Sequence, residues 1–216
     1  MDEAREDRIR EAFAELEEKR SLKGRIREFV DRAVAYHGFP APGVVLGAYM
    51  VDLALEKLDP APGERLYAVA ETRKCLSDSI GVLTGCTPGS HRFVLFNTGR
   101  LSLAIGREAG DALEGVRAFV VHGRTLAYPA LSAWYFNDRC AGFKEDLPAL
   151  LDDILRAGRD ILSWERVEMP LPPRDDDWEP YICPGCGEML PDKYAVDGLC
   201  RACGPESCYA GRRKKK

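Results

Sequence analysis

Long apolar segments are the first feature that this 216-residue sequence lacks. No apolar run approaches the roughly 20 residues that a membrane-spanning helix needs, so the sequence predicts no membrane helix. The N-terminal stretch MDEAREDRIREAF is charged from its second residue and has no apolar core of the kind that a signal peptide carries. We therefore expect a cytoplasmic protein with no membrane partner.

An excess of basic charge is also absent. The 31 Lys and Arg residues are outnumbered by 35 Asp and Glu residues, which gives a net charge of −4. A protein that binds nucleic acid over much of its surface is usually basic, so nucleic acid is not an expected partner of the whole chain. The terminal GRRKKK is a local exception, which we interpret as a solvated end, with a nucleic-acid contact as the alternative.

Histidine is scarce, with three residues, whereas cysteine is plentiful, with eight. Disulfides are rare in a reducing cytoplasm, so these cysteines need another explanation. Five of them crowd the last part of the chain, while Cys75, Cys86 and Cys140 lie far upstream. This division predicts two different kinds of cysteine chemistry.

The C-terminal cysteines include two CxxC motifs, CPGC at 183–186 and CRAC at 200–203, separated by thirteen residues. Each motif turns two thiolates toward one point, and two such motifs supply the four-sulfur shell that zinc prefers. An iron centre or redox-active thiols are the alternatives. Cys208 has no CxxC partner and is expected to be a bystander. The predicted ligands of one structural zinc are Cys183, Cys186, Cys200 and Cys203.

A filled four-ligand shell leaves no position for a substrate, so this zinc is expected to stabilise a segment too short to fold by itself. Gly187 and Gly204 each follow the second cysteine of a motif. We expect both glycines to adopt positive φ, in turns that free backbone amides to donate to the sulfurs.

Apolar periodicity and turn residues predict a mixture of helices and strands. A helical segment is expected over 1–36, broken near Gly24 and ending at His37 and Gly38. On the helix expected over 43–58, Gly43 and Gly47 lie four residues apart, so another backbone can approach closely there. Further helices are expected at 75–85 and 144–162, strands at 66–72, 92–97, 116–121 and 164–173, and a loop at 86–91.

These elements do not alternate regularly, so we predict an α+β fold: a mixed sheet with flanking helices, an N-terminal helical segment and a C-terminal four-cysteine zinc ribbon. The proline- and aspartate-rich stretch PLPPRDDDWEP is typical of a linker. The expected domains are an α+β core at 1–174, a zinc ribbon at 175–208 and a basic tail at 209–216.

Four upstream residues form a second candidate site: His37, Cys75, Asp78 and Cys86. His37 precedes a proline corner, and Cys75 begins a predicted helix whose dipole would lower the thiol pKa and favour thiolate. Such a set could bind a metal or provide an activated nucleophile. The alternative is that the histidine is a helix cap and the cysteines are small apolar residues of the core.

Several motifs follow one another along the chain: HGFPAPGVVLG, ETRKCLSDSIGVLTGCTPGS, FNTGRLSLAI and the CxxC pair. Together they resemble the FmdE family over about residues 31–204. That family is named for the FmdE component of molybdenum formylmethanofuran dehydrogenase, an enzyme whose catalytic centre belongs to its other components. The resemblance implies an α+β core, often a homodimer, with a C-terminal zinc ribbon in many members. It also implies a molybdenum- or tungsten-enzyme assembly as a partner.

The match to the family's first motif, His-Gly-His-x-Cys-Pro-Gly, is incomplete. His37 and the Pro42-Gly43 pair match, but Phe39 replaces the second histidine and Ala41 replaces the cysteine. The second motif keeps Cys75, Asp78, Thr84, Gly85, Cys86 and Thr87, and then Gly89-Ser90-His91-Arg92 replaces the usual Gly-Lys-Gly-Asn. Since two candidate ligands are lost, any core metal site is expected to be partly degenerate.

Three functions follow from these observations. The first is a metal-binding accessory or regulatory protein of the FmdE type, with a structural zinc and the altered core site as a second metal position. The second is an enzyme that uses Cys75 and His37. The third is a regulator whose ribbon and tail contact nucleic acid.

Overall fold

We analysed a computed structural model of the chain, which describes residues 3–110, 112–138, 146–170, 177–205 and 207–209. Its contacts divide the chain into two units, Met1–Pro172 and Pro173–Lys216, which we call the core unit and the ribbon unit. The proposed linker residues 171–176, Cys140 and the tail beyond residue 209 lie outside the described residues. The described residues contain no helix long and apolar enough to cross a membrane.

Two helices open the core unit, α1 (Glu3–Lys19) and α2 (Gly24–His37). Gly24 has φ +59° and begins α2, so the chain breaks at the glycine that the sequence indicated. Gly38 closes α2 with φ +84° and donates its N–H to the carbonyl of Val34. This is the left-handed glycine stop expected after His37.

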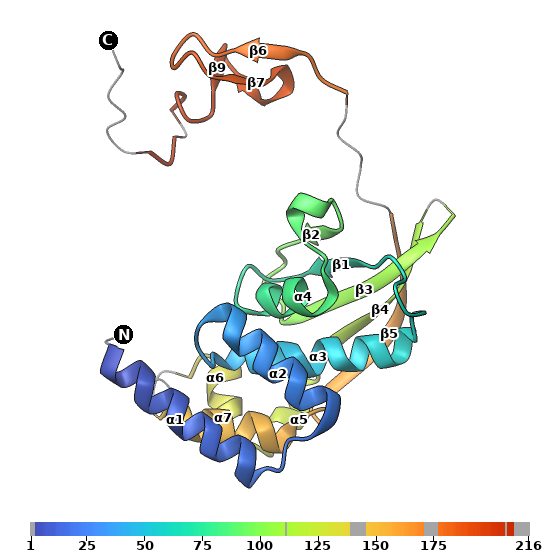
Figure 1. The fold of residues 1–216 in the computed structure, drawn as a ribbon, viewed down its shortest axis with the longest axis vertical. Helices are drawn as coiled ribbons and strands as arrows, with labels where there is room; N and C mark the ends of the chain where they lie inside the picture. The colour runs from blue at the N-terminus through green and yellow to red at the C-terminus, as the bar shows by residue number, and fades with distance from the viewer. Residues whose placement is uncertain (1–2, 111, 139–145, 171–176, 206, 210–216) are drawn as a thin grey trace. The chain divides into compact units, whose positions relative to one another are not determined.

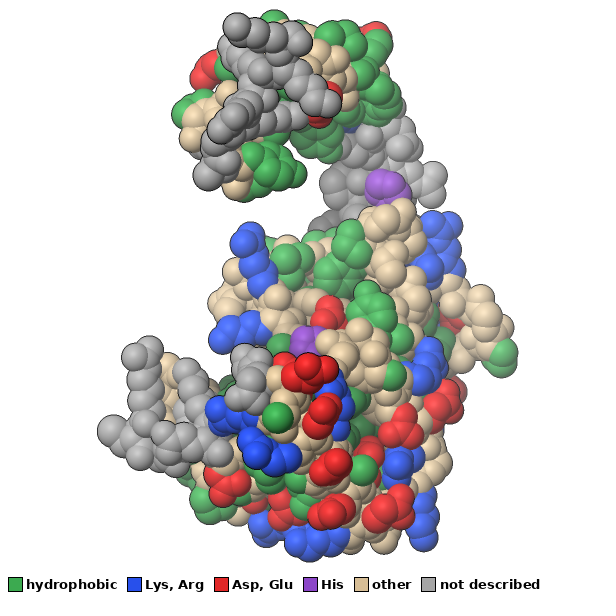
Figure 2. Space-filling model, turned by 60° about the vertical axis from the view of Figure 1, so that its left-hand side comes forward, with side chains coloured by type: hydrophobic (Ala, Val, Ile, Leu, Met, Phe, Trp, Pro, Cys, Tyr) green, Lys and Arg blue, Asp and Glu red, His purple; other side chains and the backbone are tan. Residues whose placement is uncertain are grey.

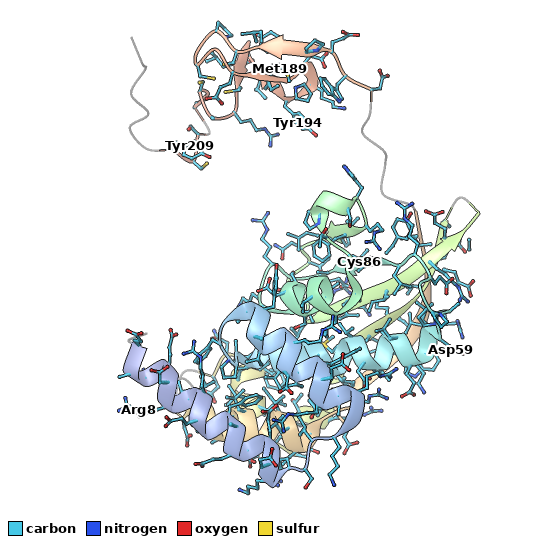
Figure 3. The ribbon with its side chains drawn as sticks, viewed as in Figure 1. Arg8, Asp59, Cys86, Met189, Tyr194 and Tyr209 are labelled. Carbon is cyan, nitrogen blue, oxygen red and sulfur yellow. The ribbon has the colours of Figure 1, made fainter. Side chains whose placement is uncertain are left out.

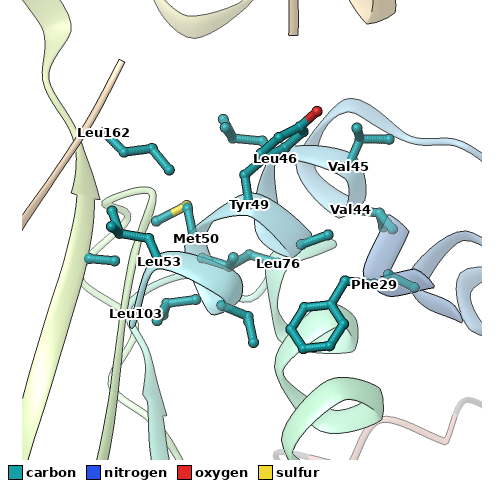
Figure 4. Packing of buried hydrophobic residues seen from close by; sticks show 14 of the residues in the cluster. Phe29, Val44, Val45, Leu46, Tyr49, Met50, Leu53, Leu76, Leu103 and Leu162 are labelled. Carbon is teal, nitrogen blue, oxygen red and sulfur yellow. The ribbon is translucent and has the colours of Figure 1, made fainter. Parts of the chain in front are cut away.

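The central helix α3 (Pro42–Leu58) is buried along most of its length. It contacts β3, β4 and β5 of the sheet as well as α2, α4 and α7 (Figure 1). In Figure 4, Met50 and Leu53 lie beside Leu103 and Leu162, while Val44 lies near Phe29 of α2. The core is therefore built around α3.

The close approach predicted at the paired glycines of α3 is confirmed. A Cβ atom on Gly47 would lie 2.7 Å from Oγ of Ser79, and one on Gly43 would lie 3.3 Å from Cβ of Cys75. Both neighbours lie at or within α4 (Leu76–Thr84). The Ser79 hydroxyl also donates to the carbonyl of Val44 at 3.0 Å, so α4 is locked onto α3 at this point.

The sheet of the core unit has five strands in the order β2-β1-β3-β4-β5. β1 and β2 pair in parallel, and the other pairs are antiparallel, which makes the sheet mixed. The predicted α+β class is therefore confirmed. The strands are β1 (Tyr67–Ala70), β2 (Phe93–Leu95), β3 (Ser102–Ala109), β4 (Ala112–Val120) and β5 (Leu162–Pro170).

Two sequence predictions need correction here. Strand β3 is absent from the predicted elements, because a glycine and two charged residues interrupt its apolar pattern. The helix expected over 144–162 is α7 (Leu147–Ala157), which ends at Gly158 (φ +48°) before β5 begins. The remaining core elements are the short helices η1 (Pro88–Ser90), α5 (His122–Thr125) and α6 (Pro129–Tyr135).

In its described residues, 177–205 and 207–209, the ribbon unit contains two small antiparallel hairpins and one short helix. The first hairpin pairs β6 (Pro180–Ile182) with β7 (Met189–Pro191). The second pairs β8 (Ala195–Val196) with β9 (Leu199–Cys200), and η3 (Asp192–Tyr194) connects the two. Within the described residues, this unit has little apolar core beyond its cysteines.

Candidate metal centre and core cleft

The first cysteine motif is a tight turn between β6 and β7. The N–H of Cys183 donates to the carbonyl of Glu188 at 3.0 Å, and the N–H of Gly187 donates to the carbonyl of Cys183 at 2.7 Å. Gly187 has φ +76°, the left-handed conformation that the sequence predicted. The turn therefore reverses the chain between Cys183 and Cys186.

The second motif follows β9 and differs in detail. The amides of Cys203 and Gly204 both donate to the carbonyl of Cys200, at 2.8 and 3.0 Å. Gly204 does not have positive φ, so the expectation for that residue was wrong. Its amide completes a helix-like turn, for which a right-handed backbone is sufficient.

The four sulfur atoms lie together. All four lie within 4.8 Å of one another, and the Sγ atoms of Cys186 and Cys200 are 3.8 Å apart. A tetrahedral site with Zn–S bonds of about 2.3 Å has sulfur–sulfur edges of about 3.8 Å. The amide of Cys200 donates to Sγ of Cys183 at 3.3 Å, a hydrogen bond that favours thiolate. The residues present therefore fit a four-coordinate zinc.

Backbone amides reach the sulfurs, as the sequence predicted. The amide of Cys200 donates to Sγ of Cys183, and hydrogen bonds from the backbone of Gly185 and Cys186 also lower the pKa of Cys183. The amides of Gly187 and Gly204 themselves bond to carbonyl oxygens.

Sequence spacing missed the role of Gly185. A Cβ atom there would lie 3.0 Å from Cβ and 3.1 Å from Sγ of Cys203. Glycine at 185 is what lets the two motifs approach each other.

The thiols of this cluster have divergent pKa values. Hydrogen bonding from the backbone amide of Cys200 lowers the pKa of Cys183 to about 6. Burial and the neighbouring cysteine side chains raise the pKa of Cys203 to about 12. Four thiolates at this separation repel one another, and a bound divalent cation would remove that repulsion.

The four candidate residues of the core unit do not gather at one point as the ribbon cysteines do. His37, at the end of α2, places Nδ1 2.6 Å from a carboxylate oxygen of Asp78 in α4. Among the described residues, only the four ribbon cysteines form a group of three or more potential ligands with all donor atoms within 4.8 Å. His37, Cys75, Asp78 and Cys86 do not form such a group. The histidine and the aspartate make a pair between helices.

Cys75 directly precedes α4 and is half-buried. Burial raises the pKa of its thiol, so the expectation of a thiolate activated by the helix dipole was wrong. The cost of removing charge from water outweighs the favourable effect of the helix end here. Cys75 is therefore a neutral thiol in this structure.

Cys86 is fully buried in the core (Figure 3), and its thiol donates to the carbonyl of Leu66 at 3.2 Å. Burial raises its pKa as well. The two residues that replace the family's ligands also pack into the core: Phe39 contacts the apolar cluster, and Ala41 is buried at the start of α3. Their side chains serve packing at positions where the family's motif has a histidine and a cysteine.

A separate cleft of about 920 Å³ opens beside the start of α4. Of the four core candidates, Cys75 alone lines it. The other walls come from the start of α3, the segment before β3 and the end of α6. These segments lie far apart along the chain, so no local pattern predicts that they form one cavity.

The fold and the four-cysteine cluster define a class: an α+β core unit followed by a small unit with a zinc-type site. The family described as "FmdE, Molybdenum formylmethanofuran dehydrogenase operon" matches residues 36–170, which is more than half of the chain. The chain therefore belongs to the FmdE family, as the sequence motifs indicated.

Two further comparisons agree with this assignment. A tungsten formylmethanofuran dehydrogenase FmdE-like protein from Syntrophus aciditrophicus has a similar crystal structure, with a TM-score of 0.71 and 28% identity, over 85% of this chain and 94% of that chain. A probable S-adenosyl-L-methionine-binding protein from Archaeoglobus fulgidus is 29% identical over 203 residues. That match covers 86% of this chain and 55% of the relative, so the chain spans about half of the relative's length.

Proposed function

We propose that this chain is a zinc-containing accessory protein of the FmdE type, whose ribbon unit docks on a partner protein. The observation that carries the zinc assignment is the group of four sulfurs, with a 3.8 Å edge and an amide donor to Cys183. When protein ligands fill all four positions, zinc stabilises a fold and does not hold a substrate. The ribbon unit would depend on the ion for its stability.

Exposed apolar side chains support a docking role for the ribbon unit. Ile182 and Met189 pair across the β6–β7 hairpin and are 60% and 57% exposed. Met189 and Tyr194 can be located on this unit in Figure 3. Clustered apolar side chains in water are typical of a surface that a partner covers. Among the described residues of this unit, the large apolar side chains that are exposed are Trp178, Ile182, Met189, Tyr194, Val196 and Tyr209.

The partner we propose is a molybdenum- or tungsten-enzyme assembly. The description of the family and the name of the similar Syntrophus protein support this proposal. We also propose that the core unit forms a homodimer, as the resemblance implies. Sedimentation equilibrium of the full chain tests the dimer directly, because a single species at monomer mass would contradict it.

The geometry favours binding over catalysis at the core residues. His37 is engaged by Asp78, and the Cys75 thiol has a raised pKa. An activated cysteine needs the opposite shift and a nearby base. On the face of the core unit shown in Figure 2, acidic and basic side chains are interspersed, so that face does not favour a nucleic-acid footprint. A nucleic-acid footprint requires a continuous basic surface.

The Archaeoglobus relative is named for S-adenosylmethionine, which carries a sulfonium cation. The cleft of this chain is lined by the cationic side chains of Arg73, Lys74 and Arg100. These cations would repel the sulfonium of that ligand and attract its carboxylate, so they give it no clear preference, and we do not propose it for this chain.

Metal analysis of the purified full chain tests the zinc site. We expect one zinc per chain in the wild type and its loss in Cys200→Ala. Cys208→Ala is the matched control, because Cys208 is exposed and lies outside the four-sulfur group. Unchanged zinc in Cys200→Ala would contradict the assignment.

Co-purification from the native host tests the docking role. A tagged wild-type chain should retain a molybdenum- or tungsten-containing enzyme. A double variant, Ile182→Asp with Met189→Asp, should lose the enzyme while keeping its zinc. Equal recovery of the enzyme with both proteins would contradict docking through this surface.

A further inference from the structure

The cleft beside Cys75 has a one-sided charge. Its lining includes three cations, Arg73, Lys74 and Arg100, and no aspartate or glutamate. Arg100 already forms an ion pair with Glu71 at 2.9 Å. Within the described part of the chain, neither Arg73 nor Lys74 forms an ion pair. Two positive charges therefore remain uncompensated at one wall of the cleft.

The N-terminal ends of two helices add to this positive wall. Helices α3 and α4 both begin at the cleft, and neither has a side-chain cap. Gly43 and Leu76 are both buried, Leu76 completely, so their amides do not face the open cleft. The ends of the two helices act through their partial positive charge, which favours an anion nearby.

The thiol between these groups does not oppose an anion. Cys75 lines the cleft, and burial raises its pKa, so the side chain is neutral. A thiolate at this point would repel an anionic ligand, whereas a thiol can donate a weak hydrogen bond to one. The charge of the wall is therefore set by Arg73, Lys74 and the two helix ends.

Aromatic rings and amide side chains also line the cleft. Trp134 and Tyr135 come from the end of α6, and Asn97 and Asn137 come from the segments after β2 and α6. Aromatic rings stack against planar groups, and amide side chains both donate and accept hydrogen bonds. A volume of about 920 Å³ is within the range of small-molecule sites.

We propose that this cleft binds a small phosphate monoester that carries a planar aromatic ring, a ligand of the mononucleotide class. The phosphate would lie between Arg73 and Lys74, near the N-terminal ends of α3 and α4. The ring would lie at the side of the cleft formed by Trp134 and Tyr135. This site is distinct from the four-cysteine site and from the His37–Asp78 pair, and it uses none of their residues.

Calorimetric titration of the full zinc-loaded chain tests the proposal. The probes are AMP, GMP, FMN and pyridoxal phosphate, each compared with its dephosphorylated form and with inorganic phosphate. We expect at least one monoester to bind about tenfold more tightly than both comparisons, since hydrogen bonds to charged groups contribute this much. Binding of that ligand should weaken as salt is added.

Three variants locate the site. Arg73→Ala and Lys74→Ala should each weaken that ligand by about tenfold, and Trp134→Leu should remove its advantage over inorganic phosphate. Lys23→Ala is the matched control, an exposed lysine outside the cleft, and should bind as the wild type does. Zinc content and circular dichroism verify folding of each variant.

Two results would overturn the proposal. In the first, no monoester binds more tightly than inorganic phosphate. In the second, a monoester binds, but with equal affinity to the wild type, Arg73→Ala and Lys74→Ala.

Discussion

His37 and Asp78 join two helices: the Nδ1 atom of the last residue of α2 lies 2.6 Å from a carboxylate oxygen in the first turn of α4. Asp78 is 42% exposed and His37 is 23% exposed, so the pair lies at the surface of the helical layer. The family's motif has a second histidine and a cysteine close to this histidine, at the positions of Phe39 and Ala41. Here the structure gives the histidine a structural partner.

His37→Ala should therefore lower stability without changing metal content. We expect a loss of about 1 kcal/mol in urea unfolding, the usual contribution of one such hydrogen bond. Asp78→Asn is a milder control, because an amide oxygen can still accept from the ring N–H. A wild-type chain with more than one bound metal, reduced to one by His37→Ala, would contradict this prediction and restore a core metal site.

The burial of Glu17 makes the stability of the protein depend on pH. Its side chain is buried, one carboxylate oxygen has no hydrogen-bond partner, and the other lies 3.4 Å from Arg27. Burial, with the nearby charge of Asp31, raises its pKa from 4.5 to about 7. The folded state thus holds this proton more tightly than the unfolded state. Stability should fall as pH rises from about 4.5 to about 7, by about 3 kcal/mol in total.

Glu17→Gln tests this, since the amide keeps the shape and cannot ionise. We expect the variant to be about 1–2 kcal/mol more stable than the wild type at pH 8, because the amide group needs its own partners. At pH 4.5, where the wild type has regained about 3 kcal/mol, the sign should reverse and the variant should be about 1–2 kcal/mol less stable than the wild type. Glu18→Gln is the control, with a side chain that is 81% exposed. Urea unfolding curves that change equally with pH in the wild type and Glu17→Gln would contradict the prediction.

At Gly47 there is no room between α3 and α4 for a larger side chain. In Gly47→Ala the new Cβ would lie 2.7 Å from Oγ and 2.9 Å from Cβ of Ser79. Overpacking of this kind costs about 1–3 kcal/mol, partly offset by the higher helix propensity of alanine. We expect a net loss of about 1–2 kcal/mol. Gly123→Ala is the matched control, because nothing lies within 4 Å of its added Cβ, and it should be neutral.

The predictable parts of this fold are those that depend on local sequence. The break at Gly24, the stop at Gly38 and the CxxC turns follow from backbone geometry and short spacing. Strand β3 does not, because Gly106 is required by its partner strand: a Cβ there would lie 2.8 Å from the carbonyl of Glu114. No local pattern reveals that cross-strand contact.

The core candidate site also depends on contacts that local sequence does not reveal. Cys75 begins the predicted helix and Cys86 follows it, and both were candidate ligands, yet one lines a cleft and the other is fully buried with its thiol bonded to Leu66. Their environments depend on how α4 packs against α3 and the sheet. The cleft itself joins segments from residue 42 to residue 137, which only the tertiary fold brings together.

Gly185 provides the sharpest test of the zinc site. In Gly185→Ala the added Cβ would lie 3.0 Å from Cβ and 3.1 Å from Sγ of Cys203, so that cysteine must move away from its place in the tetrahedron. We expect zinc affinity to fall by about tenfold or more, as it does when ligand positioning is disturbed. The rate and extent of zinc transfer to a chromophoric chelator measure this loss.

Gly204→Ala is the matched control for that substitution. It makes the same change beside the other motif, but the nearest atom to its Cβ would be 3.6 Å away and its φ is not positive. It should therefore retain wild-type zinc affinity. Equal zinc loss from both variants would mean that the ribbon unit is merely intolerant of substitution. Equal retention by both would mean that the approach of Gly185 to Cys203 does not position a zinc ligand.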